Sequence, residues 1–86
     1  MKNLEFEPGA FDDLLWWARQ DHKKVTQILQ LVDALRRDPF RGIGKPEPLK
    51  HNLAGYWSRR IDQEHRLVYK VTNEKIVIHS CRLHYK

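Results

Sequence analysis

The chain has 86 residues and a mass of 10.4 kDa, a size that accommodates one domain with a thin core. Hydrophobic residues make up 41% and charged residues 31%, a balance typical of a globular domain, and no apolar run approaches the ~18 residues that a membrane helix needs. The single cysteine, Cys81, excludes an internal disulfide and a multi-cysteine zinc site, and the N-terminus lacks the apolar core of a secretion signal, so we expect a cytoplasmic protein.

The net charge of +5 is unevenly distributed along the chain. Residues 1–35 carry 4 basic and 6 acidic side chains, residues 36–70 carry 9 and 4, and residues 71–86 carry 3 and 1. A positive field confined to the second half of a small domain favours a polyanion or an acidic protein as partner. The alternative is a solvated basic face that only aids solubility.

Residues 4–6 are expected to form a short strand that ends before Pro8. Residues 10–20 are expected to form a helix whose apolar face carries Phe11, Leu14, Leu15 and Ala18. Asp21 can cap a second helix, which Pro39 ends and whose apolar stripe is Val25, Ile28, Leu29, Val32 and Leu35. Two amphipathic helices joined by so short a turn predict a helical hairpin.

Glycines and prolines in residues 40–51 exclude a helix or a central strand there. The apolar period then falls to two, and residues 56–61, 65–71 and 76–83 are expected to be strands of an antiparallel meander. The elements predict a single α+β domain over residues 1–86, with the helical hairpin packed on one face of a small antiparallel sheet. The opposite face is then free to carry a site.

Alternation along the predicted strands indicates which side chains share a face. In the middle strand, Leu67 and Tyr69 face the helices, and Arg66 and Lys70 face away. Alternation in the last strand is less clean, with Val77, His79, Cys81 and Leu83 on one face and Ile78, Ser80, Arg82 and His84 on the other. Beside these strands, Glu47 lies between two prolines and among basic neighbours.

A carboxylate, an arginine and a histidine on a basic sheet face suit the cleavage of RNA without a metal ion. A base removes the proton of a 2′-hydroxyl, the oxygen attacks the adjacent phosphorus, an acid protonates the departing 5′-oxygen, and a cation stabilises the phosphoryl oxygens. Histidine, with an ordinary pKa of about 6.5, can donate a proton near neutrality, and the planar fork of arginine fits a phosphate. The sequence contains no metal-ligand spacing, nucleophile motif or phosphate-cradling glycine loop.

Each candidate also has an ordinary structural interpretation. Glu47 can be a solvated loop acid paired with Lys45 or Lys50, and Arg66 an exposed strand residue. His84 lies close to the end of the sequence, where fraying is usual. His65 and His79 fit core or rim positions, and Arg59 with Arg60 fits either a charged edge or an RNA contact.

Residues 39–53 resemble the YoeB/Txe family of bacterial toxins, as do residues 55–61 and 64–69. The family ending, Cys-Arg-aromatic-His-Tyr, is present at residues 81–85 as Cys-Arg-Leu-His-Tyr. The match is nearly gapless over residues 39–85 and looser in the N-terminal half. Leu83 stands where the family has an aromatic residue, and Lys86 follows the tyrosine with which the family usually ends.

The resemblance implies a RelE-like fold and the toxin of a type II toxin–antitoxin system, an mRNA interferase that cuts mRNA in the ribosomal A site. The partners that it implies are a YefM-like antitoxin, the ribosome and mRNA. The resemblance is also compatible with a homodimer, and it implies neither a cofactor nor a metal. By position, Glu47 is similar to the general base of the family, Arg66 to its phosphate stabiliser and His84 to its general acid. Residues similar to those that bind or orient the RNA are Lys50, His51, Arg60 and Tyr85.

Two other hypotheses compete with this one. A non-catalytic module could use the same basic face to bind RNA or protein, and a toxin of the same fold could act on DNA gyrase. The set of Glu47, Arg66 and His84 favours the nuclease, because binding alone requires positive charge but no positioned acid and base.

Overall fold

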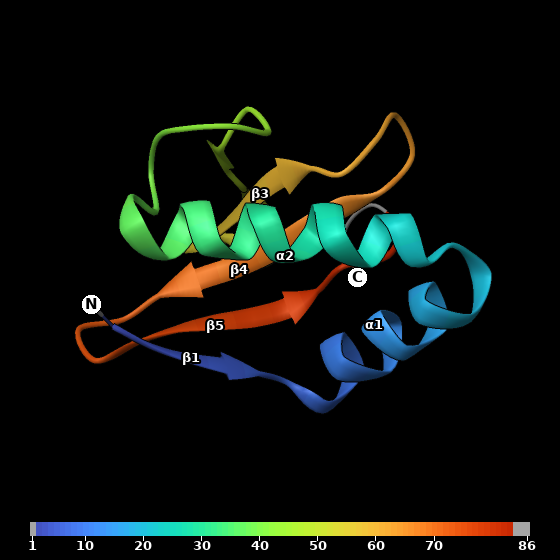
Figure 1. Ribbon diagram of the computed structural model, residues 1–86. Helices are drawn as coiled ribbons and strands as arrows, with labels where there is room; N and C mark the ends of the chain where they lie inside the picture. The colour runs from blue at the N-terminus through green and yellow to red at the C-terminus, as the bar shows by residue number, and fades with distance from the viewer. Residues whose placement is uncertain (1, 84–86) are drawn as a thin grey trace.

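The computed structural model describes residues 2–83 and consists of two helices packed on a five-stranded sheet (Figure 1). The strand order is β1-β5-β4-β3-β2, and both helices lie on the same side of the sheet. This arrangement confirms the predicted α+β class with a helical hairpin on one face. In chain order the elements are β1 (Asn3–Phe6), α1 (Pro8–Gln20), α2 (His22–Arg37), β2 (Glu47–Pro48), the 3-10 turn η1 (His51–Leu53), β3 (Tyr56–Arg60), β4 (Arg66–Val71) and β5 (Lys75–Ser80).

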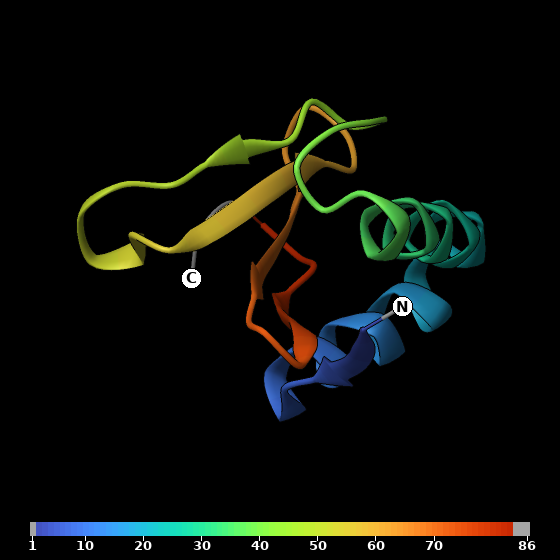
Figure 2. The same cartoon turned by 90° about the vertical axis from the view of Figure 1, so that its left-hand side faces the viewer.

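The sheet is mixed, because β1 pairs in parallel with β5, with Leu4 opposite Ile76. The three C-terminal strands form the predicted antiparallel meander. No hairpin turn joins β1 to β5, since the chain passes through both helices and three strands between them, and the parallel pairing therefore has no local sequence signal. Figure 2 shows the helices on one side of the sheet and the β2–η1 segment projecting on the other.

The helix boundaries follow the predicted stop and start signals. Pro8 occupies the first turn of α1, where its missing N–H has no intrahelical partner to lose. Asp21 caps α2, and its side chain accepts a hydrogen bond of 3.2 Å from the backbone N–H of Lys23. The second helix ends at Arg37, just before Pro39. Within residues 2–83, neither helix combines the length and the apolar character that crossing a bilayer would require.

The buried faces of the helices differ in part from the prediction. In α2, Leu31 is 3% exposed whereas Leu29 is 47% exposed, so the stripe is turned slightly from its expected position. In α1 the predicted face is wrong except for Leu14: Phe11 and Leu15 are exposed, as is Ala18. The side chains that turn inward are Ala10, Asp13, Leu14 and Trp17. The predicted stripe and the observed inner stripe have the same helical spacing. The inner stripe is the buried one because Asp13 and Trp17 each form a hydrogen bond with the backbone of Cys81.

A register shift also changes the faces of the last strand. Tyr69 pairs with Ile78 but the preceding Val68 pairs with Ser80, so His79 is an extra residue in β5. The bulge interrupts strict alternation, which explains why Ile78 and Cys81 both belong to the core although the pattern separated them. The strand ends at Ser80, three residues earlier than expected.

Candidate functional site

On the sheet face opposite the helices, aligned residues from four strands form a row in which Ser58, Val68 and Ser80 are buried and Glu47 is exposed. Glu47 of β2 pairs with Ser58 of β3, Ser58 pairs with Val68 of β4, and Val68 pairs with Ser80 of β5. Directly opposed residues of antiparallel strands point to the same face, so Glu47 lies at one end of a row of short side chains.

Arginines form the next row on the same face. Arg60 at the end of β3 pairs with Arg66 at the start of β4, two residues from Ser58 and from Val68 respectively. Strand spacing and rise place the Cα atoms of Glu47 and Arg66 about 12 Å apart, a gap that their long side chains and one bound nucleotide linkage can bridge. On the other side of the row, the Lys70 ammonium lies 5.4 Å from the ring centroid of Tyr56. The face is therefore cationic with a carboxylate at its edge.

A cavity of about 440 Å³ lies beside this row and is lined by Glu47–Leu53. It brings together three of the predicted site residues, Glu47, Lys50 and His51, whereas Arg60 and Arg66 are not part of its lining. Glu47 is exposed, and among residues 2–83 its carboxylate has no ion pair, so the alternative pairing with Lys45 or Lys50 is not found. An exposed carboxylate thus shares the cavity lining with the side chains of Lys50 and His51.

Adjacent arginines have opposite roles in this structure. Arg60 is exposed on the site face, but Arg59 points toward the helices and is fully buried. Its guanidinium donates to the carbonyl oxygens of Asp38 (2.6 Å), Arg41 (2.9 Å) and Ile43 (3.1 Å), so Arg59 fixes the loop that leads into the cavity segment. Arg59 therefore matches neither a charged edge nor an RNA contact. Its position between Trp57 and Ile61 in the period-two pattern was the available signal for an inward side chain.

Tyr69 completes the anchor of Arg59. Its hydroxyl accepts a hydrogen bond of 3.1 Å from Nε of Arg59 and donates one of 2.6 Å to the carbonyl oxygen of Pro39. Burial raises the pKa of the Tyr69 hydroxyl above its usual value, and the adjacent guanidinium opposes only part of that rise. The phenol therefore remains protonated and able to donate.

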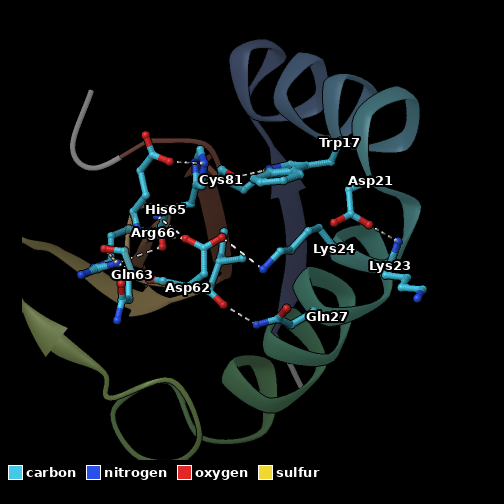
Figure 3. A network of polar contacts seen from close by, with 12 residues as sticks. Trp17, Asp21, Lys23, Lys24, Gln27, Asp62, Gln63, His65, Arg66 and Cys81 are labelled. Atoms are coloured by element: carbon cyan, nitrogen blue, oxygen red, sulfur yellow. Dashed lines mark hydrogen bonds and ion pairs between the residues drawn. The ribbon is translucent and has the colours of Figure 1, made fainter.

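The guanidinium of Arg66 is oriented by the loop between β3 and β4 (Figure 3). Its Nη1 donates to the carbonyl oxygens of Asp62 (2.6 Å) and His65 (3.0 Å). The carboxylate of Asp62 in turn accepts from the N–H groups of Glu64 (2.9 Å) and His65 (2.7 Å) and lies 3.1 Å from Nζ of Lys24 in α2. Partial burial raises the pKa of Asp62, but these hydrogen bonds and the charge of Lys24 lower it more, so its pKa lies below the usual value. Sequence reasoning missed Asp62, although an Asp in the turn that connects two strands is typical, because its side chain can accept hydrogen bonds from the following backbone N–H groups.

Two histidines are in structural positions, as their ordinary interpretation predicted. His65 is 8% exposed and packs against Trp17 with ring centroids 4.7 Å apart. Nδ1 of His79 lies 2.6 Å from a carboxylate oxygen of Glu7 and the ring is 5.3 Å from that of Tyr56.

The two remaining predicted site residues, His84 and Tyr85, lie outside the described residues. Over residues 2–83 there is no group of three or more His, Cys, Asp or Glu side chains arranged to hold a metal ion. The described part of the site thus consists of the three residues at the cavity and the arginine pair beside it.

Comparison with known proteins identifies the family. The model of the family described as YoeB-like toxin of bacterial type II toxin-antitoxin system matches residues 6–85. Toxin YoeB of Escherichia coli (strain K12) is 55% identical over 82 residues, which are 95% of this chain and 98% of that protein.

Solved structures agree with this match. The YoeB/ParE toxin from Agrobacterium tumefaciens superposes with a TM-score of 0.93 at 46% identity, covering 99% of this chain and 100% of the other. The YoeB dimer from Staphylococcus aureus gives a TM-score of 0.89 at 48% identity over 98% of each chain. The heterotetrameric YoeB-YefM toxin-antitoxin complex from the same organism gives 0.87 at 48% identity over 99% of each chain. The chain therefore belongs to the YoeB-like toxins of bacterial type II toxin–antitoxin systems.

Proposed function

We propose that this toxin is a metal-independent endoribonuclease that acts on the ribosome and cleaves mRNA in the A site. The observation that carries the proposal is the placement of Glu47, Lys50 and His51 around one cavity, beside the Arg60–Arg66 pair, in a chain of the YoeB-like family. The proposal assigns the protein to the cytoplasm, where ribosomes translate, and treats residues 1–86 as a single toxin domain.

The proposed reaction is an internal transesterification. Glu47 removes the proton of a 2′-hydroxyl, the 2′-oxygen forms a bond to the adjacent phosphorus, and the bond from phosphorus to the 5′-oxygen breaks. His84 gives a proton to that departing oxygen, while the guanidinium of Arg66 stabilises charge on the non-bridging oxygens. The products carry a 2′,3′-cyclic phosphate and a 5′-hydroxyl. The contacts of Arg66 Nη1 with the loop carbonyls support its role, because they hold the guanidinium in a fixed orientation before the substrate arrives.

The other predicted residues would hold the RNA. Lys50 and His51 at the cavity and Arg60 beside Arg66 would contact the backbone of the substrate, and Tyr85 would position the scissile nucleotide. Positioning by the ribosome would complement this small site, since alignment of the reacting atoms alone can supply several kcal/mol. The cationic sheet face would also favour docking on ribosomal RNA, with an affinity that falls as the salt concentration rises.

Besides the ribosome, we propose a YefM-like antitoxin as a partner, and we propose that the chain forms a homodimer. The relative from Staphylococcus aureus forms a complex with YefM and also a dimer, and this chain has the same fold at 48% identity. The surplus of basic over acidic residues in the second half of the chain would favour an acidic segment of such an antitoxin.

The test uses purified ribosomes programmed with a defined mRNA. Wild-type protein is compared with Glu47→Gln, Arg66→Gln and His84→Gln, and cleavage is followed by primer extension. Arg37→Gln is the matched control for Arg66→Gln, because it removes the same positive charge but lies at the exposed end of α2, on the other side of the sheet. We expect loss of about 10²–10⁴-fold in cleavage rate for variants of the acid or base, and an unchanged rate for the control.

The chemistry of the ends separates the hypotheses. Cuts inside codons with 2′,3′-cyclic or 3′-phosphate and 5′-hydroxyl ends support the nuclease. Undiminished growth arrest by His84→Gln, or products with other ends, would refute this mechanism. Arrest without mRNA cleavage would favour the binding module, and arrest with inhibited DNA supercoiling would favour the toxin directed against gyrase.

A further inference from the structure

Leu83, the last described residue, is held from both sides by the start of β4. Its N–H donates a hydrogen bond of 2.7 Å to Nδ1 of His65, and its carbonyl oxygen accepts one of 2.8 Å from the N–H of Arg66. The φ angle of Leu83 is +64°, in the left-handed region that L-residues with bulky side chains rarely adopt. A backbone conformation of this kind persists only where surrounding contacts impose it.

The imidazole of His65 is itself fixed. The ring is 8% exposed and meets the edge of the Trp17 ring at 4.7 Å with an interplanar angle of 78°. Because Leu83 donates to Nδ1, that nitrogen must present its lone pair, and the ring proton is on Nε2, which lies 3.4 Å from a carboxylate oxygen of Glu64. His65 is therefore an oriented hydrogen-bond acceptor.

Side chains of α1 hold the two residues before Leu83. Nε1 of Trp17 donates to the carbonyl oxygen of Cys81 at 2.7 Å, and the N–H of Cys81 donates to the carboxylate of Asp13 at 3.0 Å (Figure 3 shows the Trp17 contact). The guanidinium of Arg82 lies 3.9 Å from the ring centroid of Trp16. Residues 81–83 are thus attached one by one to α1 and β4, whereas terminal segments without such contacts usually fray.

We propose that His65 is a positioning residue that aligns His84, a role that rests on the proposed function of His84 as general acid. By accepting the N–H of Leu83, His65 fixes the point from which the chain continues to His84, one peptide unit of about 3.8 Å farther on. The same clamp includes the backbone of Arg66, whose guanidinium is the proposed phosphate ligand. One anchor therefore holds both Leu83, the residue before the proposed acid, and the backbone of the proposed phosphate ligand.

Proton transfer requires donor and acceptor within about 2.6–3.2 Å, and a displacement of about 1 Å can lower the rate about 100-fold. His65→Leu removes the acceptor and keeps an apolar side chain of similar size against Trp17. We expect it to lower the single-turnover cleavage rate on programmed ribosomes by about 10–100-fold. His65→Asn can place an oxygen where Nδ1 lies, and we expect it to recover a large part of that loss.

The decisive measurement is a double-mutant cycle with His84→Gln. If His65 acts through His84, His65→Leu slows the wild-type protein but leaves the residual rate of His84→Gln unchanged. Thr72→Ala is the control for a general structural effect, because it removes hydrogen bonds in the turn between β4 and β5, at the far end of β4 from Leu83. We expect Thr72→Ala to lower the thermal midpoint without a comparable fall in cleavage rate.

The outcomes are distinguishable. An equal loss in both backgrounds, or a His65→Asn variant as slow as His65→Leu, would overturn the positioning role while leaving the acid assignment intact. A His84→Gln variant as fast as wild type would overturn the acid assignment and, with it, the positioning role. Amide hydrogen exchange of Leu83 checks the clamp independently of activity, and its protection should be lost in His65→Leu and retained in Thr72→Ala.

Discussion

Replacing Arg59 by lysine should destabilise the protein by about 3 kcal/mol. The guanidinium is fully buried and donates to the carbonyl oxygens of Asp38, Arg41 and Ile43 and to the hydroxyl of Tyr69, at 2.6–3.1 Å. Each hydrogen bond from a charged donor contributes about 1.5–3 kcal/mol. The single nitrogen of lysine cannot reproduce a planar fork directed at four acceptors, and we count the loss of about two bonds at the lower of these values, about 1.5 kcal/mol each.

This cost is large for a domain of this size, whose total stability is expected to be about 5–15 kcal/mol. A loss of 3 kcal/mol corresponds to a fall of about 12–24 °C in Tm. The loop that Arg59 holds leads directly into the cavity lined by Glu47–Leu53, so the cavity should lose its shape before the rest of the domain unfolds.

Equilibrium unfolding in urea measures the loss. Trp57 packs against Phe40 of the anchored loop with ring centroids 4.9 Å apart, so its fluorescence reports this region, while Trp16 and Trp17 and the circular dichroism report the helices. The matched control is Arg60→Lys, the same substitution on the exposed face, which should change the stability by less than about 0.5 kcal/mol. If Arg59→Lys and Arg60→Lys had equal stabilities, the buried guanidinium would not be the anchor that we infer.

Three further outcomes follow from single contacts. Gly44→Ala should lower the free energy of unfolding by about 1–3 kcal/mol, because φ of Gly44 is +85° and an added Cβ would lie 2.9 Å from a side chain of α2. Gly9→Ala is the control: its added Cβ meets no atom within 4 Å, so this variant should be neutral or stabilising. Similar urea midpoints for the two variants would contradict this reasoning. The pKa of Asp62 is lower in the folded protein than in the unfolded chain, so its ionised carboxylate stabilises the fold. This contribution is complete above the ordinary pKa of about 3.9 and is lost as the pH falls through the lowered pKa of the folded state. The stability difference between wild type and Asp62→Asn should therefore shrink below about pH 4, and a difference independent of pH would argue against the network. When the logarithm of the affinity for ribosomes is plotted against the logarithm of the salt concentration, Arg60→Gln should reduce the steepness of the slope by about 0.7–0.9, and Arg37→Gln should leave it unchanged. Equal slopes for Arg60→Gln and the wild-type protein would place Arg60 away from the RNA.

Local signals predicted most of the secondary structure. The cap at Asp21, the stop at Pro39 and the change of period after residue 51 gave the helical hairpin and the meander, because these features depend on neighbouring residues. The inner face of α1 was not predictable in this way, since two apolar stripes have equal spacing and the choice depends on hydrogen bonds to Cys81. The bulge at His79 and the pairing of β1 with β5 depend likewise on residues far apart in the sequence.

The site was predictable to a different extent. The residue types and their context suggested RNA cleavage with Glu47 as the carboxylate, whereas the selection of Lys50 and His51 came from the family resemblance. The structure places these three residues at one cavity. The strand register shows that Arg60 and Arg66 are directly opposite each other on adjacent strands. Alternation within each strand predicts the face of a side chain but not its neighbour on the next strand. The inward orientation of Arg59 was missed because an arginine in a strand is expected to be exposed, and only the carbonyl oxygens of a distant loop make its burial favourable.

The parallel pairing of β1 with β5 has a consequence for synthesis of the toxin. Leu4 meets Ile76 only after the ribosome has added the 71 residues between them, so the sheet cannot close on a partly made chain. Until then the inner stripe of α1 has no strand to cover it, and the row from Glu47 to Ser80 does not exist. A chain that ends before residue 75 lacks β5, so β1 has no strand to pair with and we expect such a chain not to reach this fold.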